Sequence, residues 1–333
     1  MLDERRAAIL RAVVEGYIET AQPVGSTHVA RREGIAVSPA TIRNDMVALE
    51  QEGYLTQPHT SAGRVPTDKG YRFFVDSLVG PGQLDVDRQQ QVRSFFASAH
   101  GALEDMLHQT SQLLSNLTDY AAVVVGPAHE QATLRSIQLV GLGARTGLVV
   151  AVLSNGVVEK ATVDLADDTG DERLAPASAH LSMDLIGGTL ANLPPLTPSG
   201  DPMLDDVCAA AVRALEAGHD KEPDQVFVGG ASRVAVAFDA VDTVRRVLGT
   251  LEQQFVVVTL LRDVLDRGLS VAIGAEHGFA ALAECSLIVA PYSVEGEPAG
   301  SIGVLGPTRM HYPEALAAVA VVSQRLGRHL SEG

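Results

Sequence analysis

The sequence predicts an α+β multidomain protein whose first 80 residues form a winged helix-turn-helix. The chain has 333 residues, of which 46% are apolar, enough to bury more than one core. Helical and strand-like periodicities both occur along it. The net charge of −16 is unevenly spread, because residues 1–76 hold nine basic and ten acidic residues and the remainder carries almost all of the excess. An anionic body repels phosphates, so any contact with nucleic acid falls to the first 76 residues.

The N-terminal segment has the pattern of three helices followed by a β-hairpin. We expect helices at 3–19, 27–32 and 39–51, with Ser38 as the N-cap of the third and Pro39 at its first position. Residues 54–66 follow as a hairpin with a polar tip, and another helix starts after Thr67. This order within 80 residues is typical of a winged helix-turn-helix, and Gly80-Pro81-Gly82 marks its end.

The third helix has two contrasting faces. At helical spacing, Ile42, Met46 and Leu49 share one face, which we expect to be buried. Small side chains on the opposite face would let the helix enter a major groove, where Asn pairs with adenine and Arg with guanine. The alternative is a solvated surface helix, although such faces usually carry Glu and Lys. The predicted DNA-binding residues of this helix are Ser38, Pro39, Ala40, Thr41, Arg43, Asn44 and Val47.

Asp45 interrupts this face with a negative charge. We expect it to hold Arg43 or a backbone amide in place, not to contact DNA. The hairpin tip supplies hydroxyls, backbone N–H groups and a guanidinium suited to phosphates or the minor groove. The predicted wing contacts are His59, Thr60, Ser61, Gly63 and Arg64. An ordinary polar turn is the alternative for this tip.

Beyond residue 80 the pattern is mixed. Residues 81–120 form a helical linker, and the leucine-rich stripe along 103–117 either packs on its own domain or forms a dimer seam. Further helices are expected at 174–193, 203–217, 239–254, 280–284 and 313–330. Strands are expected at 121–125, 134–142, 147–154, 157–165, 226–230, 255–261, 270–274, 286–291 and 300–305, with Asn155-Gly156 as a hairpin turn.

Patterns that carry catalysis or bind cofactors do not appear. The chain has no Gly-Lys pair for a phosphate loop, no HExxH pair for zinc and no GxSxG elbow. Cys208 and Cys285 do not form a CxxC pair and are expected in the core. The longest apolar run, 255–261, is far shorter than a membrane span. We therefore expect a cytoplasmic, nucleoid-associated protein that is not an enzyme, with no cofactor, no metal and no membrane partner.

Several segments together resemble the heat-inducible transcription repressor HrcA family. The resemblance extends over nearly the whole chain and is weakest at about 175–255, where only position and pattern agree. It rests on Ser38–Met46, Leu49-Glu50, Gly53–Leu55, Gln57–Arg72, Ala283–Ile288 and Gly303–Tyr312.

The resemblance implies a fold, partners and a function. It implies a GAF-like α/β domain made of 121–175 and 256–333, interrupted by an inserted dimerising domain at 176–255. It also implies a homodimer that binds an inverted-repeat operator in double-stranded DNA, represses heat-shock (chaperone) operons and depends on the groE-type chaperonin for activity. One alternative is a ligand-responsive regulator of another regulon, with a small-molecule pocket near residues 300–306. A second alternative is an enzyme fused to a DNA-binding head.

Overall fold

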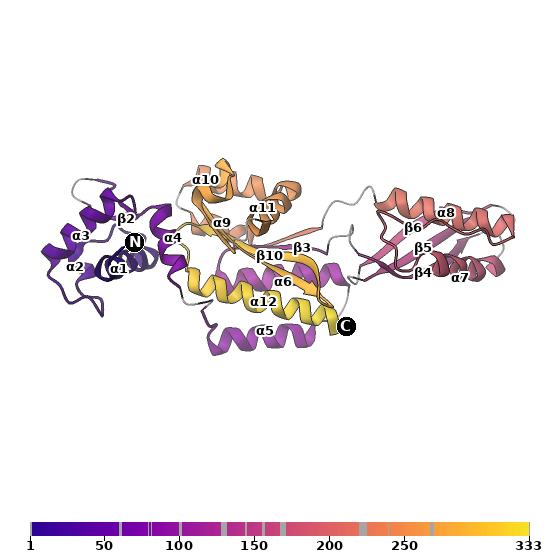
Figure 1. Ribbon diagram of the computed structural model, residues 1–333, viewed down its shortest axis with the longest axis horizontal. Helices are drawn as coiled ribbons and strands as arrows, with labels where there is room; N and C mark the ends of the chain where they lie inside the picture. The colour runs from indigo at the N-terminus through magenta and orange to yellow at the C-terminus, as the bar shows by residue number, and fades with distance from the viewer. Residues whose placement is uncertain are drawn as a thin grey trace.

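The molecule is elongated and consists of three regions in a row (Figure 1). The computed structural model describes residues 2–59, 62–78, 80, 82–99, 102–127, 132–143, 145–154, 157–166, 171–219, 225–238, 240–266 and 270–332. We call residues 2–78 the N-terminal region, residues 132–219 the distal region, and residues 84–127 with 225–332 the central region. Helices and strands both contribute to the described chain, which confirms the mixed α/β class.

The N-terminal region contains four helices and one short hairpin. Its elements are α1 (Glu4–Thr20), α2 (Ser26–Val29), α3 (Pro39–Gln51), β1 (Leu55–Thr56), β2 (Val65–Pro66) and α4 (Asp68–Asp76). Side-chain oxygens cap three of the helices, because Asp3, Ser38 and Thr67 accept hydrogen bonds from the backbone amides of Arg6, Thr41 and Gly70. Strands β1 and β2 pair antiparallel, as the hairpin prediction required.

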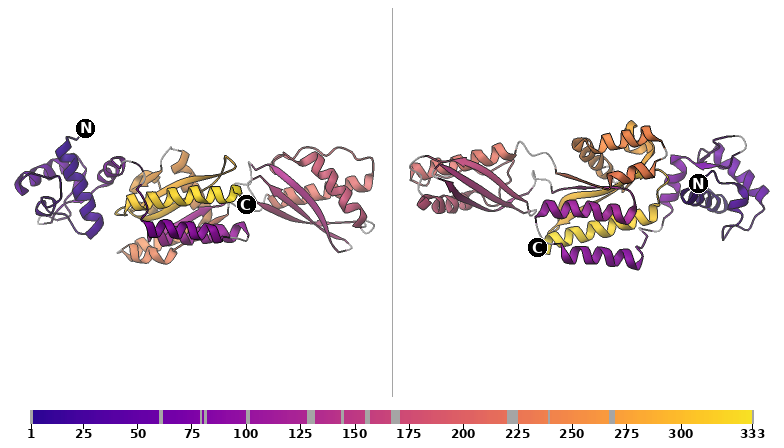
Figure 2. Two further views of the ribbon diagram at one scale, coloured as in Figure 1. Left: turned by 90° about the horizontal axis from the view of Figure 1, so that it is seen from below. Right: turned by 180° about the vertical axis from the view of Figure 1, so that it is seen from behind.

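The central region is a five-stranded antiparallel sheet between two helical layers (Figures 1 and 2). The strand order is β7-β3-β10-β9-β8. Helices α6 and α12 pack on one face with α5 beside α12, and α9, α10 and α11 lie on the other face. Strand β3 shows why both faces are covered, since Ala122 and Val124 belong to one core and Ala121, Val123 and Val125 to the other.

The elements of the central region come from two distant parts of the sequence. The first part supplies α5 (Val86–Ser98), α6 (Leu103–Thr118) and β3 (Ala121–Val125). The second supplies β7 (Val226–Gly229), α9 (Ala231–Ala237), α10 (Val241–Leu251), α11 (Gln254–Asp266), β8 (Val271–Ile273), η2 (Gly274–His277), η3 (Ala280–Leu282), β9 (Cys285–Val294), β10 (Glu297–Pro307) and α12 (Tyr312–Glu332).

The distal region is a three-stranded antiparallel sheet with helices on one face. It contains β4 (Leu134–Gly143), β5 (Thr146–Leu153), β6 (Val158–Asp164), η1 (Asp171–Arg173), α7 (Leu174–Leu185) and α8 (Pro202–His219). Helices α7 and α8 pack on β4 and β6 and on each other. Alternate strand residues face these helices, and the others form the opposite face of the sheet, which also carries the polar residues Gln138, Lys160, Thr162 and Asp164. We call the apolar members of this opposite face the distal face: Val140, Leu142, Leu148, Val150, Val152 and Val158.

The distal face is apolar and uncovered by any other described part of the chain. Leu142 is 61% exposed, Val158 47% and Val140 45%. Val140 lies directly opposite Leu148, and Val152 opposite Val158, so the apolar side chains form cross-strand pairs, with Thr162 and Ser136 completing these two rows. Exposed apolar patches of this kind in soluble proteins mark interaction surfaces.

The boundaries of the inserted region differ from the expected ones. We expected 121–175 to belong to the domain with 256–333, and 176–255 to be inserted. In the structure β4, β5 and β6 do not join the five-stranded sheet but share a separate core with α7 and α8. Strand β7 and helices α9 and α10 belong to the central region. The pairing of β7 with β3 decides this, because it joins residues about 100 positions apart.

The predicted strand 255–261 is wrong, since these residues form the first part of α11. Its buried residues Val257, Leu261 and Val264 recur at helical spacing, whereas Phe255 is 83% exposed. A short β-branched run fits either a buried strand or a buried helix. Strand β8 already forms this edge of the adjoining sheet, so the segment does not add a strand there. It packs on the sheet as part of a helical layer instead.

Other expectations can be compared directly. The predicted helical linker, 81–120, contains two helices, α5 and α6, and the leucine stripe of α6 packs on its own sheet, with Leu107, Leu114 and Leu117 buried there. Cys208 and Cys285 are buried, as expected, and are not joined in a disulfide; burial raises the pKa of Cys208 to about 11 and that of Cys285 to about 12. The predicted Asn155-Gly156 turn lies outside the described residues.

Candidate nucleic-acid interface

Helix α3 lies at the end of the molecule that the N-terminal region forms (Figure 1). One face of this helix is buried and the other is exposed. Ile42, Met46 and Leu49 are buried in the core, as their spacing predicted. Pro39, Ala40, Arg43, Asn44 and Val47 are exposed, and Thr41 is half-buried. The structure thus gathers the exposed helix residues that we predicted onto one continuous surface.

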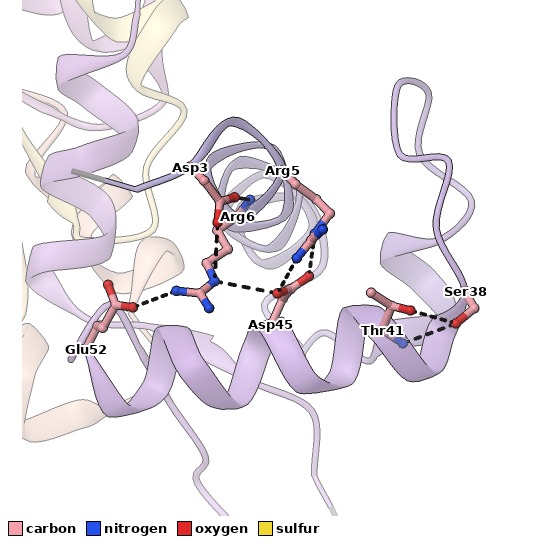
Figure 3. Close-up of polar contacts among 7 residues, drawn as sticks. All are labelled: Asp3, Arg5, Arg6, Ser38, Thr41, Asp45 and Glu52. Carbon is pink, nitrogen blue, oxygen red and sulfur yellow. Dashed lines mark hydrogen bonds and ion pairs between the residues drawn. The ribbon is translucent and has the colours of Figure 1, made fainter.

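Ser38 has a structural task at the start of this helix. Its hydroxyl accepts a hydrogen bond from the Thr41 amide at 3.2 Å and lies 3.0 Å from the Thr41 hydroxyl (Figure 3). These contacts fix the first turn, as an N-cap does. Within the described residues, the side chains of Arg43 and Asn44 make no hydrogen bond or ion pair, so the guanidinium and the amide are available to a ligand.

Asp45 anchors α3 to α1, and our expectation for its partner is wrong. Its buried carboxylate accepts hydrogen bonds from Arg5 Nε at 2.9 Å and Arg5 Nη2 at 3.2 Å (Figure 3). Arg6 Nε lies 3.5 Å from the same carboxylate, and Arg6 also donates to Glu52 at 3.0 Å. The hydrogen bond and the charge of Asp45 raise the pKa of Arg5. Arg43, the partner that we expected, is exposed, and the ion pairs of Asp45 are made with Arg5 and Arg6 instead.

The hairpin packs against the segment before α2 through close backbone contacts. Val24 and Arg64 exchange two backbone hydrogen bonds, each 2.9 Å long. A Cβ atom at Gly63 would lie 2.4 Å from the Val24 carbonyl oxygen, so only glycine fits this position. His59 is exposed near the tip, and Gly63 lies at its base. The predicted contacts Thr60 and Ser61 lie outside the described residues.

Arg64 is placed differently from our expectation of a freely presented guanidinium. Its side chain is only 14% exposed, and Nε lies 2.9 Å from Glu50 Oε2 on α3. The pair ties the hairpin to the last turns of α3. Lys69 adds a neighbouring link, because its ammonium donates to the Glu52 carbonyl at 2.8 Å and lies 4.2 Å from the centre of the Tyr54 ring.

Sequence reasoning missed the residues that hold α3 in place. Arg5 and Arg6 lie on α1, about 40 residues before Asp45, and no spacing rule connects them. Glu50 belongs to a segment that resembles the family, but its sequence position does not predict its ion pair with Arg64. Among the described residues, no group of three or more His, Cys, Asp and Glu side chains is placed to hold a metal ion. No helix in that part of the chain is long and apolar enough to cross a membrane.

Comparisons with known proteins identify the family. The family model for the HrcA protein C-terminal domain matches residues 104–316. Proteins named heat-inducible transcription repressor HrcA from Nocardioides sp. and Streptomyces avermitilis are 40% and 36% identical, each over 100% of both chains. A crystal structure of a hypothetical protein is similar in fold, with a TM-score of 0.65 and 21% identity over 100% of this chain and 99% of that one. The chain belongs to the HrcA family of heat-inducible transcription repressors.

Proposed function

We propose that the protein is a sequence-specific DNA-binding repressor of heat-shock (chaperone) operons that binds an inverted-repeat operator as a homodimer. In this proposal the N-terminal region is a winged helix-turn-helix, with α3 as the recognition helix and the β1–β2 hairpin as the wing. The single observation that carries it is the exposed face of α3 at the end of the molecule, where the side chains of Arg43 and Asn44 are exposed beside small residues. Arg and Asn in this setting read base edges in a major groove.

The contact set of the proposal follows the predicted residues with one change of role. Pro39, Ala40, Arg43, Asn44 and Val47 would face the groove, with Ser38 and Thr41 at the helix start, where amides approach phosphates. His59, Thr60, Ser61 and Gly63 would form the wing contacts. Arg64, our fifth wing residue, is assigned chiefly to holding the wing against Glu50, because its guanidinium is already paired there.

The homodimer is proposed to form through the distal face. A two-fold pair presents the same helix to each half of an inverted repeat. The distal region lies at the opposite end of the molecule from α3, so pairing there leaves both α3 faces free (Figure 1). Its exposed apolar side chains on β4 and β6, with the half-buried ones on β5, supply the surface that a stable interface buries.

Two further parts of the proposal rest on family membership. The central region would be the GAF-like domain, and the groE-type chaperonin would keep the repressor active. Titration of a chaperonin by misfolded proteins switches a repressor whose active form is only slightly favoured on its own. In the proposal, this dependence on the chaperonin makes repression respond to heat.

The sensor alternative needs a pocket near residues 300–306, and packing fills that place. A Cβ atom at Gly300 would lie 2.4 Å from the Val125 carbonyl oxygen, and one at Gly306 would lie 2.7 Å from the Tyr120 ring. Residues 301–307 of β10 are all buried between the two helical layers. No observation in this part of the structure favours a small-molecule site over a packed core.

The test of the proposed function uses the purified full chain and DNA from upstream of chaperonin genes. Fluorescence anisotropy at physiological salt compares an inverted repeat, its isolated half-site and a scrambled duplex. We expect the inverted repeat to bind at least about 10³-fold more tightly than the scrambled duplex. Equal affinity for all three duplexes, with and without chaperonin, would contradict the proposal.

Asp45→Ala is expected to weaken operator binding by about tenfold and to lower the melting temperature of the protein. The substitution removes the carboxylate that orients α3 against Arg5 and Arg6, and recognition requires a helix held within a narrow range of angles. Glu52→Ala is the control, since it removes an exposed partner of Arg6 and leaves the buried Asp45 carboxylate in place. Anisotropy titrations and thermal melts measure both effects. Unchanged affinity for Asp45→Ala would show that this anchor does not matter for recognition.

Arg64→Ala and Glu50→Ala are expected to weaken operator binding by similar factors. If Arg64 acts through Glu50, either change breaks the ion pair that holds the hairpin against α3 and leaves the salt dependence of binding unaltered. If Arg64 neutralises a phosphate instead, only Arg64→Ala lowers the slope of log affinity against log salt, by about 0.9. Titrations from low to physiological salt separate the two roles.

A further inference from the structure

The junction between the N-terminal and central regions contains an arginine, Arg72, that contacts Asp76 on its own helix and three acceptor atoms of the central region. Arg72, on α4, donates from Nε to Glu276 Oε1 at 2.9 Å and from Nη2 to the Val271 carbonyl at 2.8 Å. Nη2 also contacts Glu276 Oε2, which makes the pair bidentate. Glu276 lies on η2 and Val271 on β8, so the contacts with these two residues cross from one region to the other.

The acceptor side of this contact is fixed by its own backbone. Glu276 Oε2 also accepts a hydrogen bond from the Ile273 amide at 2.9 Å. The Arg72 side chain is 24% exposed and that of Glu276 is 31% exposed, so water screens the pair only in part. Bidentate guanidinium–carboxylate pairs are strong and directional, unlike single-contact surface pairs.

A second set of contacts holds the regions close at the same place. Asp68, at the start of α4, accepts a hydrogen bond from the Ala275 amide at 3.3 Å. Gly274 has a φ of +55°, and a Cβ there would lie 2.2 Å from Asp68 Oδ2, so the Asp68 carboxylate can lie this close to the Gly274 backbone only because the residue is glycine. The buried rings of Tyr71 and Tyr312 pack with their centres 6.1 Å apart and their planes tilted by 48°.

One covalent connection joins the two regions, between α4 and α5. A single connection does not fix an orientation, so noncovalent contacts determine the orientation of α3 relative to the central region. In a dimer joined through the distal regions, this orientation determines the distance and the rotation between the two α3 helices. Half-site spacing in an operator mirrors this geometry.

We propose that Arg72 and Glu276 are positioning residues that set which operator half-site spacing the dimer accepts. The inference rests on the proposed function and names what selects the operator within it. Arg72 and Glu276 do not contact DNA in this proposal. They keep the N-terminal region in one orientation, so that an operator with the right spacing meets both α3 faces without distortion.

The experiment measures binding to inverted repeats whose half-sites are separated by the natural spacing or by two base pairs more or fewer. A two-base-pair change rotates one half-site by about 70° relative to the other. Wild type is expected to lose at least about tenfold in affinity on either change. Arg72→Gln and Glu276→Gln are expected to bind all three spacings within about threefold of each other, with affinity for an isolated half-site unchanged. Arg72→Lys, which keeps the charge, should be intermediate.

The matched control is Arg88→Gln, which removes a partly buried arginine that pairs with the more exposed Glu314 inside the central region and should keep the wild-type spacing preference. A second readout needs no DNA. Spin labels at Gln51→Cys and Asp87→Cys report the distance between the two regions, because the natural cysteines are buried. Excess unlabelled chain restricts the signal to pairs within one protomer. Arg72→Gln should broaden this distance distribution.

The outcomes separate the two hypotheses. An unchanged spacing preference in Arg72→Gln and Glu276→Gln overturns the positioning role, whatever their overall affinity. A distance distribution as narrow as that of wild type also overturns it. If wild type binds no inverted repeat at any spacing, the proposed function fails, and the spin-label measurement alone then decides whether the contact fixes the orientation.

Discussion

Val140→Glu is expected to dissociate the homodimer and to reduce affinity for the inverted repeat by about 10²–10⁴-fold. The new carboxylate lies on the distal face opposite Leu148, where a dimer interface would bury it without a partner. Loss of the dimer removes the gain from binding two linked half-sites and leaves the affinity of each half-site alone. Sedimentation velocity measures the association state, and anisotropy measures binding to the full and half operators.

Val236→Glu is the matched control for this prediction. It places the same charge on an exposed valine of α9 in the central region, away from the distal face. We expect this variant to stay dimeric and to bind the inverted repeat like wild type. A dimeric Val140→Glu with normal operator binding would show that the distal face is not the interface. Dissociation by Val236→Glu instead would indicate that the interface lies in the central region.

Asn44→Ala and Arg43→Ala are each expected to remove about 1–3 kcal/mol of discrimination between the operator and a mismatched duplex. Their side chains are exposed and unpaired among the described residues, so truncation removes contacts to DNA without disturbing the helix. The thermal stability of the free protein should therefore remain unchanged. Competition titrations with single-base variants of the operator would also show which base position each side chain reads.

Arg93→Ala is the control for the charge removed in Arg43→Ala. Arg93 is an exposed arginine on α5 in the central region, at a distance from α3. Its replacement should change neither discrimination nor overall affinity. Wild-type discrimination in both Asn44→Ala and Arg43→Ala would remove α3 as the recognition helix, even if the protein still bound DNA tightly.

Much of the candidate interface was predictable because its determinants are local. The two faces of α3 follow from residue spacing, and its start follows from Ser38 and Pro39, whose capping effects act within one turn. The hairpin was predictable for the same reason. The anchors were not, because Asp45 with Arg5 and Arg64 with Glu50 join side chains whose proximity depends on how whole helices pack.

By itself, the sequence determined which segments are helices or strands where periodicity and capping agree, and which side of α3 faces water. The tertiary structure decided the rest: that 255–261 is helical, that β4, β5 and β6 form their own sheet, and that Arg72 joins Glu276 about 200 residues away. The physical reason is range. Backbone hydrogen bonds and side-chain spacing act over a few residues, whereas sheet pairing and ion pairs between regions depend on which surfaces the folded chain brings together.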